Sequence, residues 1–484
     1  MTGTIFSPQM FLAIFPELFL LLLGLIIFVL DLVLNKEQRK TLGWVMAFGL
    51  ILDIGLSLLI AKPGSESQLI WGGMLRFDRL GFIFRMMFLF AAAISALFAT
   101  NLDQLGRRGE FYFLLLGSTL GMCLMASSAD IIMLYLAIET TSIPLYVLAG
   151  FLKDDDKSTE AGFKYMLFGA MTSAIMLYGF SLIYGLSGTT NLYHLVTFIQ
   201  QGKTSPFVLY GALSLLLVGF AFKISAFPLH FWAPDVYEGA PTMISGFLST
   251  ASKAAGFSVL ARVLMVSFSQ LTPYWVIILA VISIATMTIG NLLALAQKNI
   301  KRLLAYSSIA HAGYALIGLV AASELGLTGL IFYLTVYIVT NLAAFGAVAV
   351  FEKTSGSSEI ASFAGLSRRS PWLAIMMLVS FLSLAGMPPF GGFVIKFSVF
   401  AAAIQQGMIG LAVIAVLNSI IGLYYYLTVL KVIYLYRSED ENIPVPMSSS
   451  FVLGLSVLSI GIVLMGTIIT PWFNIAQMAA KSLW

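Results

Sequence analysis

Long apolar stretches separated by short polar interruptions recur along the whole chain of 484 residues. Each is rich in Leu, Ile and Phe and has about the 20 residues that a helix needs to cross a bilayer. A β-barrel would instead show short strands of alternating hydrophobicity. We therefore expect an all-α integral membrane protein with about fourteen transmembrane helices, at residues 9–34, 41–61, 80–100, 110–127, 130–151, 161–186, 207–231, 241–265, 273–296, 302–321, 325–351, 371–404, 409–436 and 450–471.

Two of these spans contain helix-breaking residues. In the seventh, Pro228 follows Lys223, and in the twelfth Pro388 and Pro389 stand between glycines before Lys396. Proline removes a helical hydrogen bond and glycine weakens a helix. A membrane tolerates such breaks only where protein or cavity water satisfies the freed carbonyls. Two broken, lysine-bearing helices five spans apart are typical of a transporter with an internal repeat.

Positive charges are unevenly distributed over the loops. Loops after odd-numbered spans hold 14 Lys and Arg residues, and loops after even-numbered spans hold 4. Cytoplasmic loops carry the excess of Lys and Arg. We therefore expect the odd-numbered loops on the cytoplasmic side of the membrane and both termini on the opposite side.

Composition excludes several classes of protein. Apolar residues make up 60% of the chain and charged residues 10%, whereas soluble domains have about 25% charged residues. The net charge of +4 is spread over the loops, so we expect no nucleic-acid partner. Cys123 is the only cysteine, and His194, His230 and His311 match no metal-ligand spacing. The chain has no glycine-rich phosphate loop, so we expect no metal or cofactor on it.

Four charged residues fall deep within predicted spans: Glu139, Lys223, Lys253 and Lys396. A charge at the bilayer centre costs at least about 2.5–3.5 kcal/mol, so these residues indicate a path for protons or ions. For Lys223 the alternative is a side chain that extends to the interface from a helix end. A buried carboxylate needs a cation or a proton, and we expect Glu139 to pair with Lys223. Asp53 in the second span has no evident partner.

One helical face around Lys253 is polar. It carries Thr242, Ser245, Ser249, Ser252, Lys253 and Gly256, at intervals of 3, 4, 3, 1 and 3 residues. This spacing places all six on one narrow face. The alternative interpretation, a small-residue packing seam, leaves the lysine unexplained.

Later spans carry similar polar stripes. The two main groups are Ser307, His311 and Tyr314, and Tyr333, Tyr337, Thr340 and Asn341. His311 is the candidate relay, because an imidazole can exchange a proton near neutral pH. A hydrogen-bonded core histidine is the alternative.

Three long motifs carry a family resemblance: FKISAFPLHFWAPDVYEGAPT at 222–242, NIKRLLAYSSIAHAGY at 299–314 and GMPPFGGF at 386–393, the last followed by Lys396. They resemble the antiporter-like membrane subunits of respiratory complex I. Within that family, the sequence around Lys253, a lysine rather than a glutamate at 396 and the short C-terminal extension are most similar to the subunit N branch.

The resemblance implies two inverted five-helix repeats. The expected organisation is leading helices 1–3 at 1–106, repeat one (helices 4–8) at 107–266, repeat two (helices 9–13) at 267–438, and the last helix with the C-terminus at 439–484. It implies that Glu139 modulates the proton carrier Lys223, that Lys253 connects the two halves, and that Lys396 serves the exit side. His311 matches a polar position on the central axis.

The resemblance also implies a location, a function and partners. The membrane is expected to be a bacterial plasma membrane or a thylakoid, with the odd-numbered loops cytoplasmic (or stromal). The chain is expected to be a proton-translocating subunit of a type I NAD(P)H or ferredoxin:quinone oxidoreductase, driven by quinone reduction elsewhere. Flavin, iron–sulfur clusters and quinone are expected on partner subunits, with no redox chemistry on this chain. Its own partners are expected to be other membrane-arm subunits of the complex and the lipid bilayer. The alternatives are a subunit of an Mrp-type cation/proton antiporter or membrane-bound hydrogenase, and a non-conducting scaffold.

Overall fold

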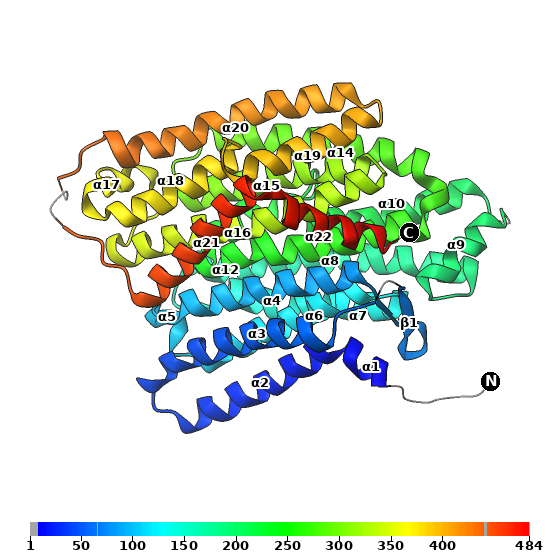
Figure 1. Cartoon of the computed structure of the whole chain (residues 1–484), viewed down its shortest axis with the longest axis horizontal. Coiled ribbons are helices and arrows are strands. Elements are labelled where there is room, and N and C mark those ends of the chain that lie inside the picture. Colours follow the sequence, from blue (N-terminus) through cyan, green and yellow to red (C-terminus); the bar gives the residue numbers. More distant parts are fainter. Residues whose placement is uncertain (1–7, 65, 203, 440–442, 484) are drawn as a thin grey trace.

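The computed structural model describes residues 8–64, 66–202, 204–439 and 443–483. Within them, twelve helices are long and apolar enough to cross a membrane, and they run side by side (Figure 1). They are α2 (Phe15–Val33), α3 (Thr41–Ile60), α4 (Arg79–Ala99), α6 (Gly109–Ser127), α7 (Ile131–Ala149), α8 (Asp156–Ser187), α10 (Pro206–Lys223), α14 (Thr272–Ala294), α15 (Ile300–Val320), α16 (Glu324–Ser355), α20 (Ile409–Leu435) and α21 (Ser449–Thr467).

The eighth and twelfth predicted spans are each assembled from shorter pieces. The eighth consists of α12 (Thr242–Phe247), a π-helical turn at Leu248–Ser252, α13 (Lys253–Arg262) and a second π-helical turn at Val263–Ser267. The twelfth consists of α18 (Pro371–Ala385) and α19 (Gly391–Gln405). The integral membrane, mainly helical fold is confirmed, and the count of fourteen crossings stays a prediction.

Short elements complete the described chain. The helices are α1 (Pro8–Ala13), α5 (Asp103–Gly106), α9 (Leu192–Gln200), α11 (Trp232–Gly239), α17 (Leu366–Arg369) and α22 (Ile469–Lys481). Strands β1 (Gln68–Ile70) and β2 (Leu75–Phe77) pair antiparallel, with Leu69 opposite Arg76. The sequence prediction contained no strand. The hairpin forms because Gly72 and Gly73 turn the chain with φ of 67° and 87°.

The broken helices lie where prolines and glycines predicted them. The seventh predicted span ends as a helix at Lys223, earlier than expected, and the chain reverses through Ser225 with φ of 57° before α11 begins. The backbone N–H of Phe227 donates to the Thr286 hydroxyl at 3.0 Å, and the Trp232 indole donates to the Phe222 carbonyl at 3.2 Å. Polar side chains from other elements therefore satisfy the freed backbone groups, as an apolar environment requires.

Helices α15 and α16 form the centre of the molecule. In each, 94% of the most apolar 18-residue window is buried, against 33% for α2, α3 and α14. Glycine allows α14 and α15 to approach closely: a Cβ at Gly290 would lie 2.7 Å from the Ala310 nitrogen. Small residues serve this purpose in membrane helix packing. The polar side chains of α15 and α16 are consequently held in the protein interior.

A buried ion pair fastens the first helices to α13. The Arg262 guanidinium binds both oxygens of Asp78, at 2.6 and 3.0 Å, and also donates to the Ala126 carbonyl. Asp78 is in addition the N-cap of α4, where it accepts from the Gly81 N–H. Bidentate pairing of this kind fixes geometry as well as charge.

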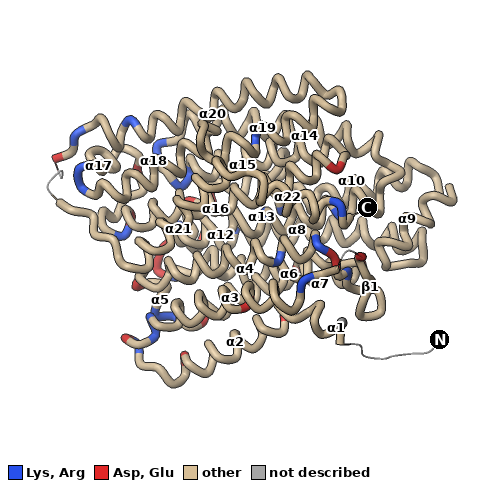
Figure 2. Tube along the Cα trace, viewed as in Figure 1, with Lys and Arg blue, Asp and Glu red and all other residues tan. Residues whose placement is uncertain are grey.

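Charged residues are concentrated at the ends of the helices (Figure 2). Many of the Lys and Arg residues gather at one end, around α5 and α17, whereas α1 and the end of α22 lie toward the other (Figures 1 and 2). This matches the uneven loop charge in the sequence.

Candidate functional site

Three of the four predicted intramembrane charges are buried. Lys223 ends α10, Lys253 begins α13 and Lys396 lies in α19, with exposed fractions of 8%, 2% and 5%. Glu139 lies in α7 and is partly exposed. The three ammonium groups make all their hydrogen bonds inside the protein, so none of them extends toward a lipid interface.

Glu139 and Lys223 approach the same stretch of α7 without touching. The Ser173 hydroxyl of α8 donates to the Glu139 carboxylate, and the Lys223 ammonium donates to the Ser142 hydroxyl, one turn after Glu139. Among the described residues no ion pair within 4.0 Å joins the two charges, although they are close enough to interact electrostatically. The pairing of the two charges therefore stays a prediction: in this conformation Glu139 acts on Lys223 through its charge, and each group is hydrogen bonded to a serine.

Lys253 binds the central helix. Its ammonium donates to the Ser308 carbonyl of α15 at 2.9 Å and to the Ser308 hydroxyl. Gly256 brings α13 against the end of α10, where a Cβ would lie 3.3 Å from that of Lys223. The elements carrying the first two lysines are thus in contact, and the second lysine is attached to α15.

His311 lies one turn further along α15 and is hydrogen bonded at both ring nitrogens. Nδ1 lies 2.6 Å from the Tyr333 hydroxyl and Nε2 lies 3.3 Å from the Tyr426 hydroxyl. The ring also stacks on Tyr337 at a centroid distance of 5.0 Å. The Tyr426 hydroxyl is in turn bonded to Ser307. The imidazole therefore connects hydroxyl groups of α16 and α20.

Lys396 closes the break between α18 and α19. Its ammonium donates to the Leu384 and Ala385 carbonyls at 3.0 and 2.9 Å, and to the Ser419 hydroxyl at 3.0 Å. The ammonium also lies 5.2 Å from the centre of the Tyr314 ring. The carbonyl end of a helix carries a partial negative charge, so the end of α18 stabilises the buried cation without a carboxylate.

Buried polar groups without a hydrogen-bond partner of suitable geometry lie near the first two lysines. The Tyr237 hydroxyl is close to the hydroxyls of Ser225 and Ser308, and its ring centre is 5.8 Å from the Lys253 ammonium. Among the described residues, the Tyr237 and Ser225 hydroxyls and His230 Nδ1 have no hydrogen-bond partner of suitable geometry. Buried groups of this kind normally bind ordered water.

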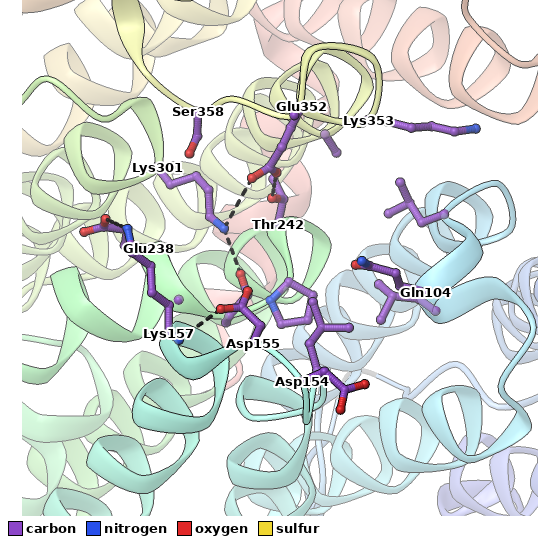
Figure 3. A pocket seen from close by; sticks show the side chains of 18 of the residues that line it. Gln104, Asp154, Asp155, Lys157, Glu238, Thr242, Lys301, Glu352, Lys353 and Ser358 are labelled. Carbon is purple, nitrogen blue, oxygen red and sulfur yellow. Dashed lines mark hydrogen bonds and ion pairs between the residues drawn. The ribbon is translucent and has the colours of Figure 1, made fainter.

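The polar stripe before Lys253 leads to a cavity at the end of the molecule rich in positive charge. This cavity has a volume of about 620 Å³ and is lined by Lys157, Glu238, Lys301, Thr242 and Glu352 among others (Figure 3). Thr242 donates to Glu352, Ser245 donates to the Tyr237 carbonyl, and Ser249 accepts from Asn341 at 2.7 Å. The stripe therefore makes hydrogen bonds with neighbouring elements and is more than a packing seam.

Several hydroxyl groups at this site were missed by the sequence analysis: Ser142, Ser173, Ser308, Ser419, Tyr237 and Tyr426. Ser142 and Ser308 could have been found, because each is three positions from a singled-out residue on the same helix, Glu139 or His311. The others come from different helices, and no spacing along the chain reveals them. Within the described residues, His, Cys, Asp and Glu form no group of three that could hold a metal ion.

Comparison with known proteins identifies the family. Residues 128–422 match the family described as NADH:quinone oxidoreductase/Mrp antiporter, transmembrane. The chain is 42% identical to NADH-quinone oxidoreductase subunit N of Moorella thermoacetica, over 95% of this chain and 96% of that protein. A chain of respiratory complex I from Thermus thermophilus is 32% identical, with a TM-score of 0.79, over 95% of this chain and 98% of that one.

The fold is shared more widely than the sequence. A chain of the Mrp complex from Dietzia has a TM-score of 0.87 at 22% identity, over 99% of this chain and 98% of that one; this likeness concerns the fold alone. The full-length identity with subunit N sequences is the more specific finding. The chain belongs to the antiporter-like membrane subunits of NADH-quinone oxidoreductase, respiratory complex I, in the subunit N branch.

Proposed function

We propose that the chain moves protons across the membrane through Glu139, Lys223, Lys253, His311 and Lys396, driven by quinone reduction in partner subunits of the complex. The main support for this proposal is that all three lysines are buried and that each ammonium group is bound to hydroxyl or carbonyl oxygens. Intramembrane charges are costly and are retained chiefly at ion and proton pathways.

The first half of the path depends on Glu139. Its negative charge favours the protonated form of Lys223. The Ser173 hydroxyl binds the carboxylate, and the Ser142 hydroxyl binds the amine. When the carboxylate and the amine separate, the amine releases its proton more readily. The unpartnered hydroxyls of Ser225 and Tyr237 mark where water would link Lys223 to Lys253.

The second half runs along α15. Ser308 receives the Lys253 ammonium, and His311 with its tyrosine partners leads toward Lys396 beside Tyr314. Since α15 is almost fully buried, hydrogen bonds rather than bulk water must carry the proton there. The positive-rich end of the molecule, with its charged cavity, is the uptake side in this proposal, and it faces the cytoplasm.

Replacing Lys253 by Met tests the proposal. Methionine keeps most of the side-chain volume but has no exchangeable proton. We expect Lys253→Met to assemble normally and to lower the number of protons pumped per NADH oxidised, measured in proteoliposomes. Lys431→Met is the matched control, because Lys431 is exposed on α20. A normal proton-to-electron ratio in assembled Lys253→Met would contradict the path and favour a scaffold role.

A further inference from the structure

A second group of buried charges lies in the leading helices, outside the series described above. Glu17 in α2, Asp53 in α3 and Arg85 in α4 have exposed fractions of 4%, 0% and 3%. Glu17 lies in the first turn of α2 and Arg85 in the second turn of α4. The group is therefore near the end of the molecule that holds α1, away from the positive-rich loops.

The two carboxyl groups differ in their contacts. Glu17 forms an ion pair with Arg85 at 2.8 Å, and the same guanidinium donates to the Ala13 carbonyl at 2.7 Å. Asp53 accepts a single hydrogen bond, from Ser57 at 3.1 Å, through Oδ1. Among the described residues, Asp53 Oδ2 has no partner, and Asp53 makes no ion pair within 4.0 Å.

The charges of this group do not balance when every member is ionised. Helix α3 packs against α2, α4 and α6, and the titratable or charged groups that act on Asp53 or share its surroundings are Glu17, Arg85 and the buried thiol of Cys123. Two carboxylates and one guanidinium leave one net negative charge among apolar helices. An unpaired buried carboxylate is strongly unfavourable, and a single proton removes the charge.

We propose that Asp53, with Glu17 and Arg85, is a second proton-binding site, and that the proton resides on Asp53 at neutral pH. Glu17 is already neutralised by Arg85, so Asp53 is the carboxyl left to accept the proton. The guanidinium in the group disfavours a metal cation at the same place. The site lies outside the proposed path, because among the described residues the hydrogen bonds and the ion pair of Glu17, Asp53 and Arg85 are made with other groups than the lysine series.

Infrared difference spectroscopy of the whole purified complex tests the site, because protonated and ionised carboxyl groups absorb at different frequencies. We expect wild type minus Asp53→Asn, at neutral pH, to show a carboxylic acid C=O band that shifts in D2O. Asp31→Asn is the control, since Asp31 is partly exposed and paired with Arg39 at 3.1 Å. A carboxylate band from Asp53 in place of the acid band would overturn the proposal.

A second variant keeps the test decisive if Asp53→Asn fails to assemble. In Glu17→Gln, Arg85 faces only one carboxyl, so Asp53 is expected to ionise. With isotopically labelled aspartate, the labelled acid band should disappear and a labelled carboxylate band should replace it. An unchanged labelled spectrum, with carboxylate bands in both proteins, would show that Asp53 is already ionised and would equally overturn the site.

Discussion

The hydroxyl of Ser142 is the hydrogen-bond partner of Lys223 at the start of the proposed path. It receives the Lys223 ammonium while standing one helical turn from Glu139. It also donates to the Ile138 carbonyl of its own helix. A hydroxyl oxygen of α7, rather than the Glu139 carboxylate, therefore binds the amine.

Ser142→Ala should weaken proton transfer without unfolding the chain. Leaving a buried donor unsatisfied costs about 1–3 kcal/mol, and about 1.4 kcal/mol is a factor of ten in rate. We expect proton pumping in proteoliposomes to slow about tenfold at unchanged amounts of assembled complex. Thr140→Val is the matched control, because Thr140 is exposed on α7 and bonds only to its own helix. Equal pumping by Ser142→Ala and wild type would remove Ser142 from the path.

At the scale of elements, the break between α18 and α19 depends on contact between the two half-helices. Gly392 in the first turn of α19 lies directly on α18: a Cβ there would be 1.6 Å from the Ser383 carbonyl oxygen. The Gly392 N–H also donates a hydrogen bond to the Ser383 hydroxyl at 3.1 Å. This contact aligns Lys396 with the end of α18.

Gly392→Ala should therefore displace α19. Overpacking of a well-packed site typically costs about 1–3 kcal/mol, and here the obstacle is backbone, which cannot rotate away. We expect less assembled complex in the membrane on native gels, and the remaining complex should pump poorly. Gly410→Ala in α20 is the control, since open space surrounds that position. Wild-type assembly and pumping by Gly392→Ala would show that the half-helices are free to separate.

Helix α11, between the two halves of the site, is held by an ionic cluster. Asp235 pairs with Lys164 at 2.6 Å and with Arg302 at 2.7 Å, and Glu238 pairs with Lys157 and Arg302 at 3.0 and 3.1 Å. Burial alone would raise the pKa of Asp235, but the hydrogen bonds and charges of Lys164 and Arg302 outweigh it and lower this pKa below its usual value. The anchored state of α11 is thus the ionised one.

The sign of this shift predicts a pH dependence. A carboxyl whose folded pKa is lowered stabilises the fold above its unfolded pKa, about 3.9 for Asp, and loses that contribution as pH falls through the folded value. We expect wild type to resist heat inactivation better than Asp235→Asn at pH 7. The difference should shrink as the pH falls below the unfolded pKa of Asp, about 3.9, toward the lower folded pKa. A difference that stays constant with pH would assign the effect of Asp235 to packing rather than charge.

Periodicity and length predicted the long helices well, because twenty apolar residues have few other stable forms in a bilayer. The short elements α9, α11 and the β1–β2 hairpin were not predicted. Their residues are apolar enough to resemble ends of spans, and their positions are set by contacts such as the Asp130–Asn191 and Leu75–Ser128 bridges. Helix α10 ends at Lys223, before Ser225 and Pro228, and only the break itself was visible in the sequence.

At the scale of the whole molecule, the uneven loop charge determines the expected orientation. Cys123 is the only cysteine and is buried, so cysteines introduced into loops report their own accessibility. Lys153 and Lys62 are both exposed, in an odd-numbered and an even-numbered loop respectively.

A membrane-impermeant maleimide should therefore label Lys153→Cys and Lys62→Cys from opposite sides. We expect Lys153→Cys to react in inverted vesicles, where the cytoplasmic face is outside, and Lys62→Cys to react in intact cells. The chain without an introduced cysteine gives the background level of labelling. Labelling of both positions from the same side would contradict the predicted topology.

The charged members of the site could be predicted because charge is rare inside this chain, which is only 10% charged. Their partners could not, because Ser, Thr and Tyr also serve helix packing and capping throughout membrane proteins. The contact of Lys253 with Ser308 joins residues 55 positions apart, and that of Lys223 with Ser142 joins residues 81 apart. Only the packing of α7, α10, α13 and α15 brings such pairs together.

The three hydrogen bonds of Lys396 determine the direction of the hydrogen bond between its amine and Ser419. A charged amine has three donors for its three oxygen partners, the Leu384 and Ala385 carbonyls and the Ser419 hydroxyl. After losing a proton it has two donors and one lone pair. The carbonyls can only accept, so Ser419 must turn around and donate to the nitrogen. Each deprotonation of this amine would then reverse one hydroxyl dipole on α20.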